Sequence, residues 1–151
     1  MKNHISKALL LLLFFIFFAP ELLSAQSVYG KIYTKEEADE LYGPVLKSLD
    51  INAAVVRALL NRAGDYIMFN YDTDSLYILD GKRNILFPNG RGRKIDPSEV
   101  FRVFSVSVVR DLLGRGNEDK VHIEKRKDVL SVTYSTNTME MSMGCPPECG
   151  Y

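Results

Sequence analysis

The stretch with the most obvious chemical potential is "MEMSMGCPPECGY", residues 139–151. It holds both cysteines of the chain and three of its five methionines. Thiolate and thioether sulfurs are soft ligands that together favour Cu(I). If the stretch begins as a strand, alternate side chains share a face about 6.6–7 Å apart. Four sulfur-bearing residues would then lie on one face, with a fifth close behind: Met139, Met141, Met143, Cys145 and Cys149. This pattern predicts a soft-metal or thiol-redox site.

The pentapeptide "CPPEC" resembles the Cys-Pro-x-x-Cys element of Sco-type copper chaperones, and the resemblance covers these five residues. It implies copper binding through the sulfurs of Cys145 and Cys149. In that family the element lies between a strand and a helix of a thioredoxin fold, and a distant His completes the site. Here the element lies two residues from the end of the sequence, with no helix to follow it.

A structural role for the same tract is the favoured interpretation. Methionine fills irregular gaps in apolar cores, so a strand with one buried face accounts for the alternating methionines. Cys145 and Cys149 would close a small ring across Pro146 and Pro147, because prolines turn the chain back on itself. Such a disulfide would fix the end of the strand. Copper binding, redox-active thiols and intermolecular pairing stay open as alternatives.

The N-terminus indicates the compartment. Lys2 and Lys7 precede an apolar run from Ala8 to Ala19, which Pro20 and Glu21 end. This is the layout of a secretory signal peptide, and the run is shorter than the 17–25 residues of a spanning helix. We expect cleavage after Ala25, with an uncleaved anchor as the alternative. The mature protein is therefore predicted to be exported, periplasmic or secreted, where cysteines pair as disulfides.

Residues 26–151 have the size of one ordinary domain, and the sequence shows no internal repeat or linker. Without Lys2, Lys7 and Glu21, the 19 basic and 19 acidic residues become 17 and 18, a net charge near −1. There is no overall basic field to attract nucleic acid. We therefore expect no nucleic-acid partner, and no stable membrane insertion once the signal peptide is removed.

Helical signals occupy the first half of this domain. Thr34 followed by Glu37 forms a capping box for a helix near 35–42. A second helix is predicted near 52–63, because Asn52 can cap it and apolar residues then recur with helical spacing. A third is expected around 107–113. Gly64 suits the left-handed position after the second helix.

Strand patterns follow from Asp65 onward. The runs "YIMFNY", "LYIL" and "NILF", then 100–105, then "VHIEKR", "VLSVTYS" and "MEMSM" are short and rich in β-branched and aromatic residues. The first two are apolar on both faces, which is typical of central strands. The expected fold is α+β: two or three short helices on an antiparallel sheet of about five to seven strands.

Two further motifs resemble functional sites. His122 shares the polar face of its strand with Glu124 and Arg126, so a solvated side chain is favoured over a ligand or a general base. The tract around Asn70 spaces acids as a calcium loop does, but it lacks the Gly and Glu that such a loop requires.

The glycine-containing loop "NGRGRK" carries three cations that could capture an anion: Arg91, Arg93 and Lys94. A solvated loop is the favoured reading of this segment.

The function predicted on these grounds is an exported, non-catalytic binding or envelope-structural module with no cofactor. Its partner would be a protein or another envelope component. The alternative is a Cu(I)-binding or thiol-redox protein that uses the C-terminal Met/Cys tract, with copper as its cofactor. A carboxylate-only enzyme also stays open, because such pairs come from distant positions.

Overall fold

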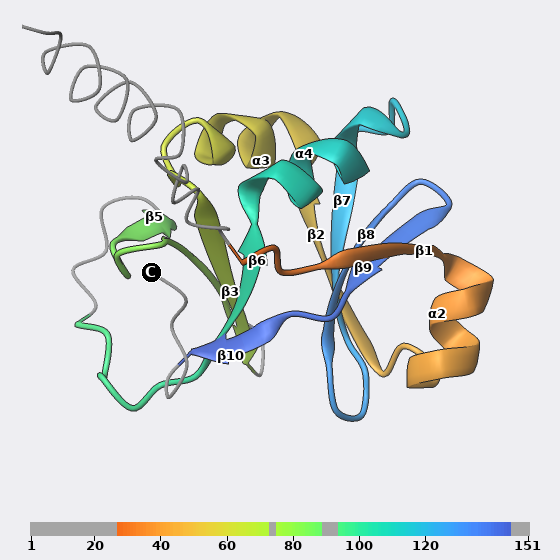
Figure 1. Cartoon of the computed structure of the whole chain (residues 1–151), viewed down its shortest axis with the longest axis horizontal. Coiled ribbons are helices and arrows are strands. Elements are labelled where there is room, and N and C mark those ends of the chain that lie inside the picture. The colour runs from red at the N-terminus through yellow and green to blue at the C-terminus, as the bar shows by residue number, and fades with distance from the viewer. Residues whose placement is uncertain (1–26, 73–74, 89–93, 146–151) are drawn as a thin grey trace, which may run out of the picture.

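The structure is a computed structural model that describes residues 27–72, 75–88 and 94–145. Two five-stranded antiparallel sheets and three helices make up this part of the chain. The predicted α+β class is confirmed, with the strands divided between two sheets (Figure 1). The predicted signal peptide, 1–25, lies outside the described residues.

Sheet A has the strand order β1-β9-β8-β7-β2: Lys31–Thr34, Asn137–Glu140, Leu130–Tyr134, Lys120–Lys125 and Lys47–Asn52. Sheet B has the order β10-β6-β3-β4-β5: Met143–Cys145, Phe101–Ser105, Tyr66–Asp72, Ser75–Asp80 and Ile85–Phe87. The helices are α2, Lys35–Tyr42; α3, Ala53–Leu60; and α4, Val106–Gly114.

The two halves of the chain exchange strands. Each half has the same order of elements: a strand, a helix and a three-stranded meander (β2-α3-β3-β4-β5, then β6-α4-β7-β8-β9). The first strand of each half pairs with the meander of the other, β2 with β7 and β6 with β3. The sequence shows no internal repeat, yet the architecture contains one. This exchange joins the sheets at their helical end, where α3 and α4 lie (Figure 1).

The main core lies between the sheets and beneath α3 and α4. Buried residues of this core come from sheet B, from α3 and α4 and from Ala63 just after α3, and sheet A contributes Ile51, Val121, Ile123, Leu130, Val132, Tyr134 and Met139. The opposite face of sheet B is also apolar and holds a second cluster that includes Met68, Phe101 and Cys145. The prediction that β3 and β4 are apolar on both faces and lie inside a sheet is confirmed.

The three helices begin close to where the sequence predicts. Thr34 caps α2 with the complete capping box, and the Asn52 side chain accepts a hydrogen bond from the Ala54 N–H at the start of α3. The helix α3 ends at Leu60, three residues before the expected end. Gly64 has a φ of 74°, so the expected left-handed residue is present in the turn that follows.

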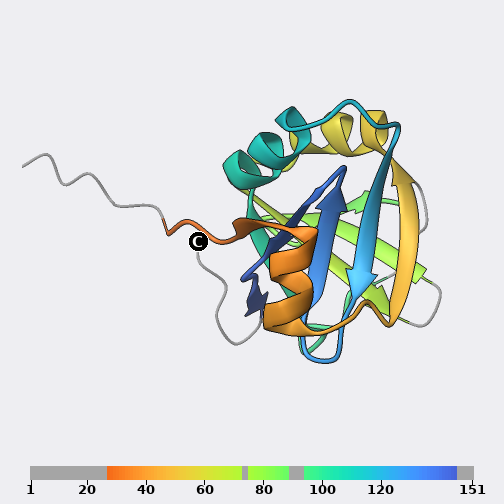
Figure 2. The same ribbon diagram turned by 90° about the vertical axis from the view of Figure 1, so that its right-hand side faces the viewer.

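The helix α2 stands apart from the main core. It covers the outer face of sheet A, with sheet B on the other side (Figure 2). Its only buried residue is Ala38. Within the described ranges, no helix is long and apolar enough to cross a membrane.

Candidate functional site

The C-terminal methionines do not share one strand face, and this part of the prediction is wrong. Met139 is fully buried in the main core at the end of β9. Met141 has a φ of 61° and is 56% exposed, and it lies where the chain leaves sheet A for sheet B. Met143 and Cys145 then belong to β10 and pack in the second cluster. A left-handed residue breaks the two-residue period, so alternation does not continue past it.

The predicted disulfide and copper site therefore stay predictions. Cys145 is fully buried, and the Arg83 guanidinium lies 3.6 Å from its sulfur. Cys149 lies outside the described residues. Among the described residues, no group of three or more His, Cys, Asp or Glu side chains could hold a metal ion.

Most of the predicted anion-binding loop also lies outside the described residues. Arg91 and Arg93 lie outside the described residues, and Lys94 is exposed. Anion binding there stays a prediction.

The outer face of sheet A, on the side of α2, is polar across all five strands. Cross-strand partners share a face, so the strand register places two rows of side chains there. One row is Tyr33, Thr138, Thr133, His122 and Asp50. The neighbouring row is Lys31, Glu140, Ser131, Glu124 and Ser48. We call these ten residues the polar face; much of it is buried beneath α2.

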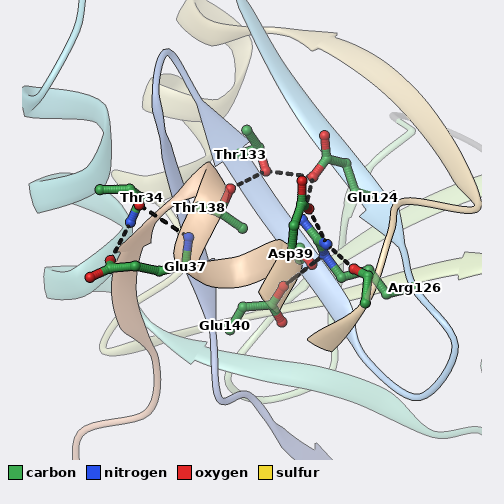
Figure 3. A network of polar contacts seen from close by, with 10 residues as sticks. Thr34, Glu37, Asp39, Glu124, Arg126, Thr133, Thr138 and Glu140 are labelled. Atoms are coloured by element: carbon green, nitrogen blue, oxygen red, sulfur yellow. Dashed lines mark hydrogen bonds and ion pairs between the residues drawn. The ribbon is translucent and has the colours of Figure 1, made fainter. Parts of the chain in front are cut away.

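Arg126, just after β7, is the centre of this buried layer, with 1% of its surface exposed. Its Nη1 lies 2.6 Å from Asp39 Oδ1 and also donates to the carbonyl oxygen of Gly43, at the end of α2. Its Nε donates to Ser131 Oγ at 3.0 Å and lies 3.2 Å from Glu140 Oε1. One guanidinium therefore joins α2 to the sheet (Figure 3).

Glu124 completes the network from β7. Its Oε2 lies 3.8 Å from Arg126 Nη2 and accepts a hydrogen bond from Thr133 Oγ1 at 2.6 Å. Thr133 and Thr138 are themselves in contact, with 2.9 Å between their hydroxyl oxygens. The Thr133 hydroxyl thus links the Glu124 carboxylate to Thr138 across the three strands, as Figure 3 shows.

Glu140 is the one residue of the network that is incompletely paired. It is fully buried, and its Oε1 accepts a hydrogen bond from Ser131. Its Oε2 has no hydrogen-bond partner among the described residues. Burial raises the pKa of the Glu140 carboxyl, against the opposing effects of the Ser131 hydroxyl and Arg126.

Two tyrosines extend the layer toward the surface. The Tyr42 hydroxyl donates to the Tyr33 hydroxyl at 3.2 Å, and the Tyr33 hydroxyl donates to the Met141 sulfur at 3.0 Å. Burial, together with the neighbouring Tyr33 and Glu140, raises the pKa of Tyr42 to about 12. The Tyr42 phenol is therefore neutral at physiological pH.

His122 lies at the other side of the polar face. As predicted, it shares that face with Glu124 and Arg126, opposite Val121 and Ile123. The expected solvated side chain, that of His122, is partly exposed at 30%, whereas Glu124 and Arg126 at the centre of the face are buried beneath α2.

The His122 ring is itself part of a surface ion-pair group. Its Nδ1 lies 2.8 Å from Asp50 Oδ1, and Lys120 Nζ lies 3.0 Å from the other oxygen of that carboxylate. Hydrogen bonds from Lys120 and then His122 lower the pKa of Asp50. The only hydroxyl next to His122 along its row is that of Thr133, which is fully buried and already paired with Glu124. Next to His122 on this row there is therefore no accessible hydroxyl, and the Asp50 carboxylate lies between His122 and Lys120.

Around α2, several apolar side chains face solvent. Leu41 is 62% exposed and Leu46 is 66% exposed, with Val45 beside it at 38%. Met141, exposed to 56%, contacts Tyr33, whose ring packs edge-on against Tyr42 with 5.8 Å between centroids. We call this set the α2 surface: Tyr33, Leu41, Tyr42, Val45, Leu46 and Met141.

Sequence reasoning found neither the buried network nor the α2 surface. The alternation of "VHIEKR" and "VLSVTYS" did indicate a polar face, but it could not reveal which element covers that face. The chain matches no protein-family model, no curated protein and no solved structure.

Proposed function

We propose that the mature chain is an exported, non-catalytic binding module that presents the α2 surface to a protein partner in the cell envelope. The observation that carries this proposal is that polar side chains are buried beneath α2 while apolar side chains around it are exposed. The helix encloses a layer of charged and hydroxyl side chains, while its Leu41 and the nearby Leu46 face water. Isolated exposed leucines are normal, but a concentration of apolar and aromatic side chains is typical of an interface.

The distribution of exposed apolar side chains supports the same surface. The described residues include seven large hydrophobic side chains that are exposed, and four of them belong to the α2 surface: Leu41, Val45, Leu46 and Met141. Tyrosine and methionine are both enriched in the buried centres of protein interfaces. A protein partner is therefore a better occupant than a small polar ligand.

The ionisable side chains of the polar face are already engaged with one another. The buried carboxylates engage hydroxyls and Arg126, and the exposed His122 engages Asp50. Export itself is proposed from the N-terminal segment, and an intact mass beginning at Gln26 would support it.

The test compares two sets of variants in the native envelope. A photo-crosslinking residue at Leu46 should capture a defined partner, whereas one at Val55 on α3, which is 38% exposed, should not. Leu41→Ser combined with Leu46→Ser should weaken binding of that partner by about 100-fold. This assumes a loss of about 3 kcal/mol of apolar burial.

The control is Val55→Ser, which removes exposed apolar surface elsewhere and should leave binding unchanged. Equal affinity of the double variant and the control would refute the proposal. Turnover of a substrate by the purified protein, unaffected by the α2 variants, would also refute it.

A further inference from the structure

The buried layer beneath α2 contains more negative than positive charge. Glu140 and Glu124 are 0% and 8% exposed, and Arg126 is the one cation paired with them. Arg126 also pairs with Asp39, which is itself exposed to solvent. If both buried carboxylates were ionised, the layer would hold one excess negative charge. A buried charge without a partner is far more costly than a buried neutral carboxyl.

The geometry identifies which carboxylate is in excess. Glu124 Oε2 has a hydroxyl donor in Thr133 as well as Arg126. Glu140 uses only Oε1, and its Oε2 is buried without a partner among the described residues. Glu140 is therefore the group that gains most from being neutral.

Within the described ranges, no charged group other than Arg126 compensates for Glu140. From β1, its cross-strand neighbour Lys31 places Nζ 4.9 Å from the centre of the Tyr33 ring, and Lys31 is exposed. From α2, Asp39 adds a negative charge and Tyr42 a neutral phenol. The facing groups on the remaining elements are those already described, Arg126, Glu124 and Ser131.

We propose that Glu140 carries a proton while α2 is docked, and that release of this proton to solvent frees α2 from sheet A. This inference rests on the proposed function, because it makes the α2 surface available to the partner only in the protonated state. An ionised Glu140 would place the excess negative charge in the dry layer. Detachment of α2 would let water reach that charge.

The direction of the pH effect follows from burial. The pKa of Glu140 is raised in the docked state. Docking is therefore strongest below the pKa of the solvated carboxyl, about 4.3, and weakens as pH rises through the raised value. Between these two values the equilibrium constant for release of α2 should increase by about tenfold per pH unit.

The experiment measures amide hydrogen exchange of the mature chain alone between pH 5 and pH 8. The readout is the protection factor, which corrects for the intrinsic pH dependence of exchange. Amides of α2 such as that of Gly43, which donates to the Asp39 carbonyl, should lose protection as pH rises, by up to about tenfold per pH unit. Amides of α3 should not change over the same range.

Three variants test whether the pH dependence comes from the proton on Glu140. Glu140→Gln imitates the protonated side chain and should keep α2 protected at every pH. Glu40→Gln, the same change at an exposed site on α2, should behave as the unaltered chain. Glu124→Gln should shrink the pH dependence, because Arg126 would then balance an ionised Glu140 by itself.

Two outcomes would overturn the inference. One is α2 protection that does not depend on pH, or that depends on pH equally in Glu140→Gln. The other is a carbon-13 titration of the unaltered chain in which the pKa of Glu140 is no higher than that of a solvated carboxyl, about 4.3, a measurement that needs no variant to fold. Neither uses the partner, so either could fail while crosslinking at Leu46 still succeeds. Conversely, if α2 is released as pH rises but crosslinking at Leu46 captures no partner, only the proposed function is refuted.

Discussion

Replacing Arg126 with methionine is the most direct test of the buried layer, because methionine keeps much of the length and removes the charge. Arg126 is 1% exposed and contacts two buried carboxylates, Glu124 and Glu140. Breaking a buried ion pair by removing one partner costs about 3–5 kcal/mol, since the remaining charge stays buried and unpaired. The expected loss in the free energy of unfolding at pH 7 is therefore about 4 kcal/mol.

Urea denaturation followed by far-UV circular dichroism measures this loss. With a typical slope of about 1–3 kcal/mol per molar, the midpoint should fall by roughly 2 M. The matched control is Arg115→Met, which breaks an i,i+4 pair with Asp111 in which the side chains are 44% and 58% exposed. Such surface pairs contribute about 0.3–0.5 kcal/mol, so the control should hardly move the midpoint.

A second comparison tests whether the unpaired charge is the cause. Adding Glu124→Gln and Glu140→Gln to Arg126→Met removes both carboxylates and should recover part of the lost stability, a non-additive result expected of groups in one network. If Arg126→Met lost less than about 1 kcal/mol, or no more than Arg115→Met, the layer would not be the dry ionic network described above.

The remaining predictions concern local structure and processing. Thr34→Ala removes the capping box of α2 and should cost about 1 kcal/mol, seen as lower hydrogen-exchange protection in α2 with little change in α3. Gly116→Ala should lower the melting temperature, because its β-carbon would lie 2.9 Å from a side-chain carbon in the β8–β9 turn. Gly114→Ala, where nothing lies within 4 Å, should not lower it; equal effects would refute the steric argument. The mature protein should expose no alkylatable thiol until Cys145 and Cys149 are reduced, which intact mass would show, and retained copper in that sample would contradict the disulfide.

The helices and the core strands could be predicted because their signals are local. Thr34 with Glu37, and Asn52 alone, mark helix starts through side-chain hydrogen bonds to the first backbone N–H groups. The strands β3 and β4 are recognisable because apolar residues occupy both of their faces. These features depend on residues only a few positions apart.

The strands β1 and β2 were missed for a physical reason. Each is an edge strand of sheet A, and "KIYT" and "KSLDIN" place few apolar residues on their inner faces. Their pairing is therefore determined by β9 and β7, which lie far away in the sequence. The apolar–polar alternation that marks a strand is weak in such segments, so the nearby helical signals determine the predicted secondary structure.

The turn after β4 shows why backbone conformation was hard to predict from residue type. "DG" at Asp80 predicts a left-handed glycine, but the residue with positive φ in this turn is Arg83, at 65°. Asp80 instead accepts hydrogen bonds from the N–H groups of Lys82 and Asn84. The Arg83 guanidinium then donates to the carbonyls of Asp96, Glu99 and Cys145, which are distant contacts. Tertiary bonds of this kind offset the strain of an unfavourable φ.

The candidate site was the least predictable part, because the helix that covers it, α2, and the strands that supply its side chains, β7 to β9, are far apart in the sequence. Alternation in β7 correctly placed His122, Glu124 and Arg126 on one face. Whether that face is wet or dry depends on α2, which precedes it by about 80 residues and buries only Ala38. A helix so polar is normally read as solvent-exposed on most sides.

The separation between α2 and the main core explains how this helix could move without unfolding the protein. The main core lies on the opposite face of sheet A, and α2 contributes none of its buried residues. The contacts that hold α2 include Ala38, the Tyr42–Tyr33 pair, the backbone hydrogen bond from Lys35 to Thr136 and the network around Arg126. Polar contacts of this kind depend on protonation, whereas apolar packing does not. A change at Glu140 can therefore act on α2 while the two sheets stay intact, as regulation of the α2 surface requires.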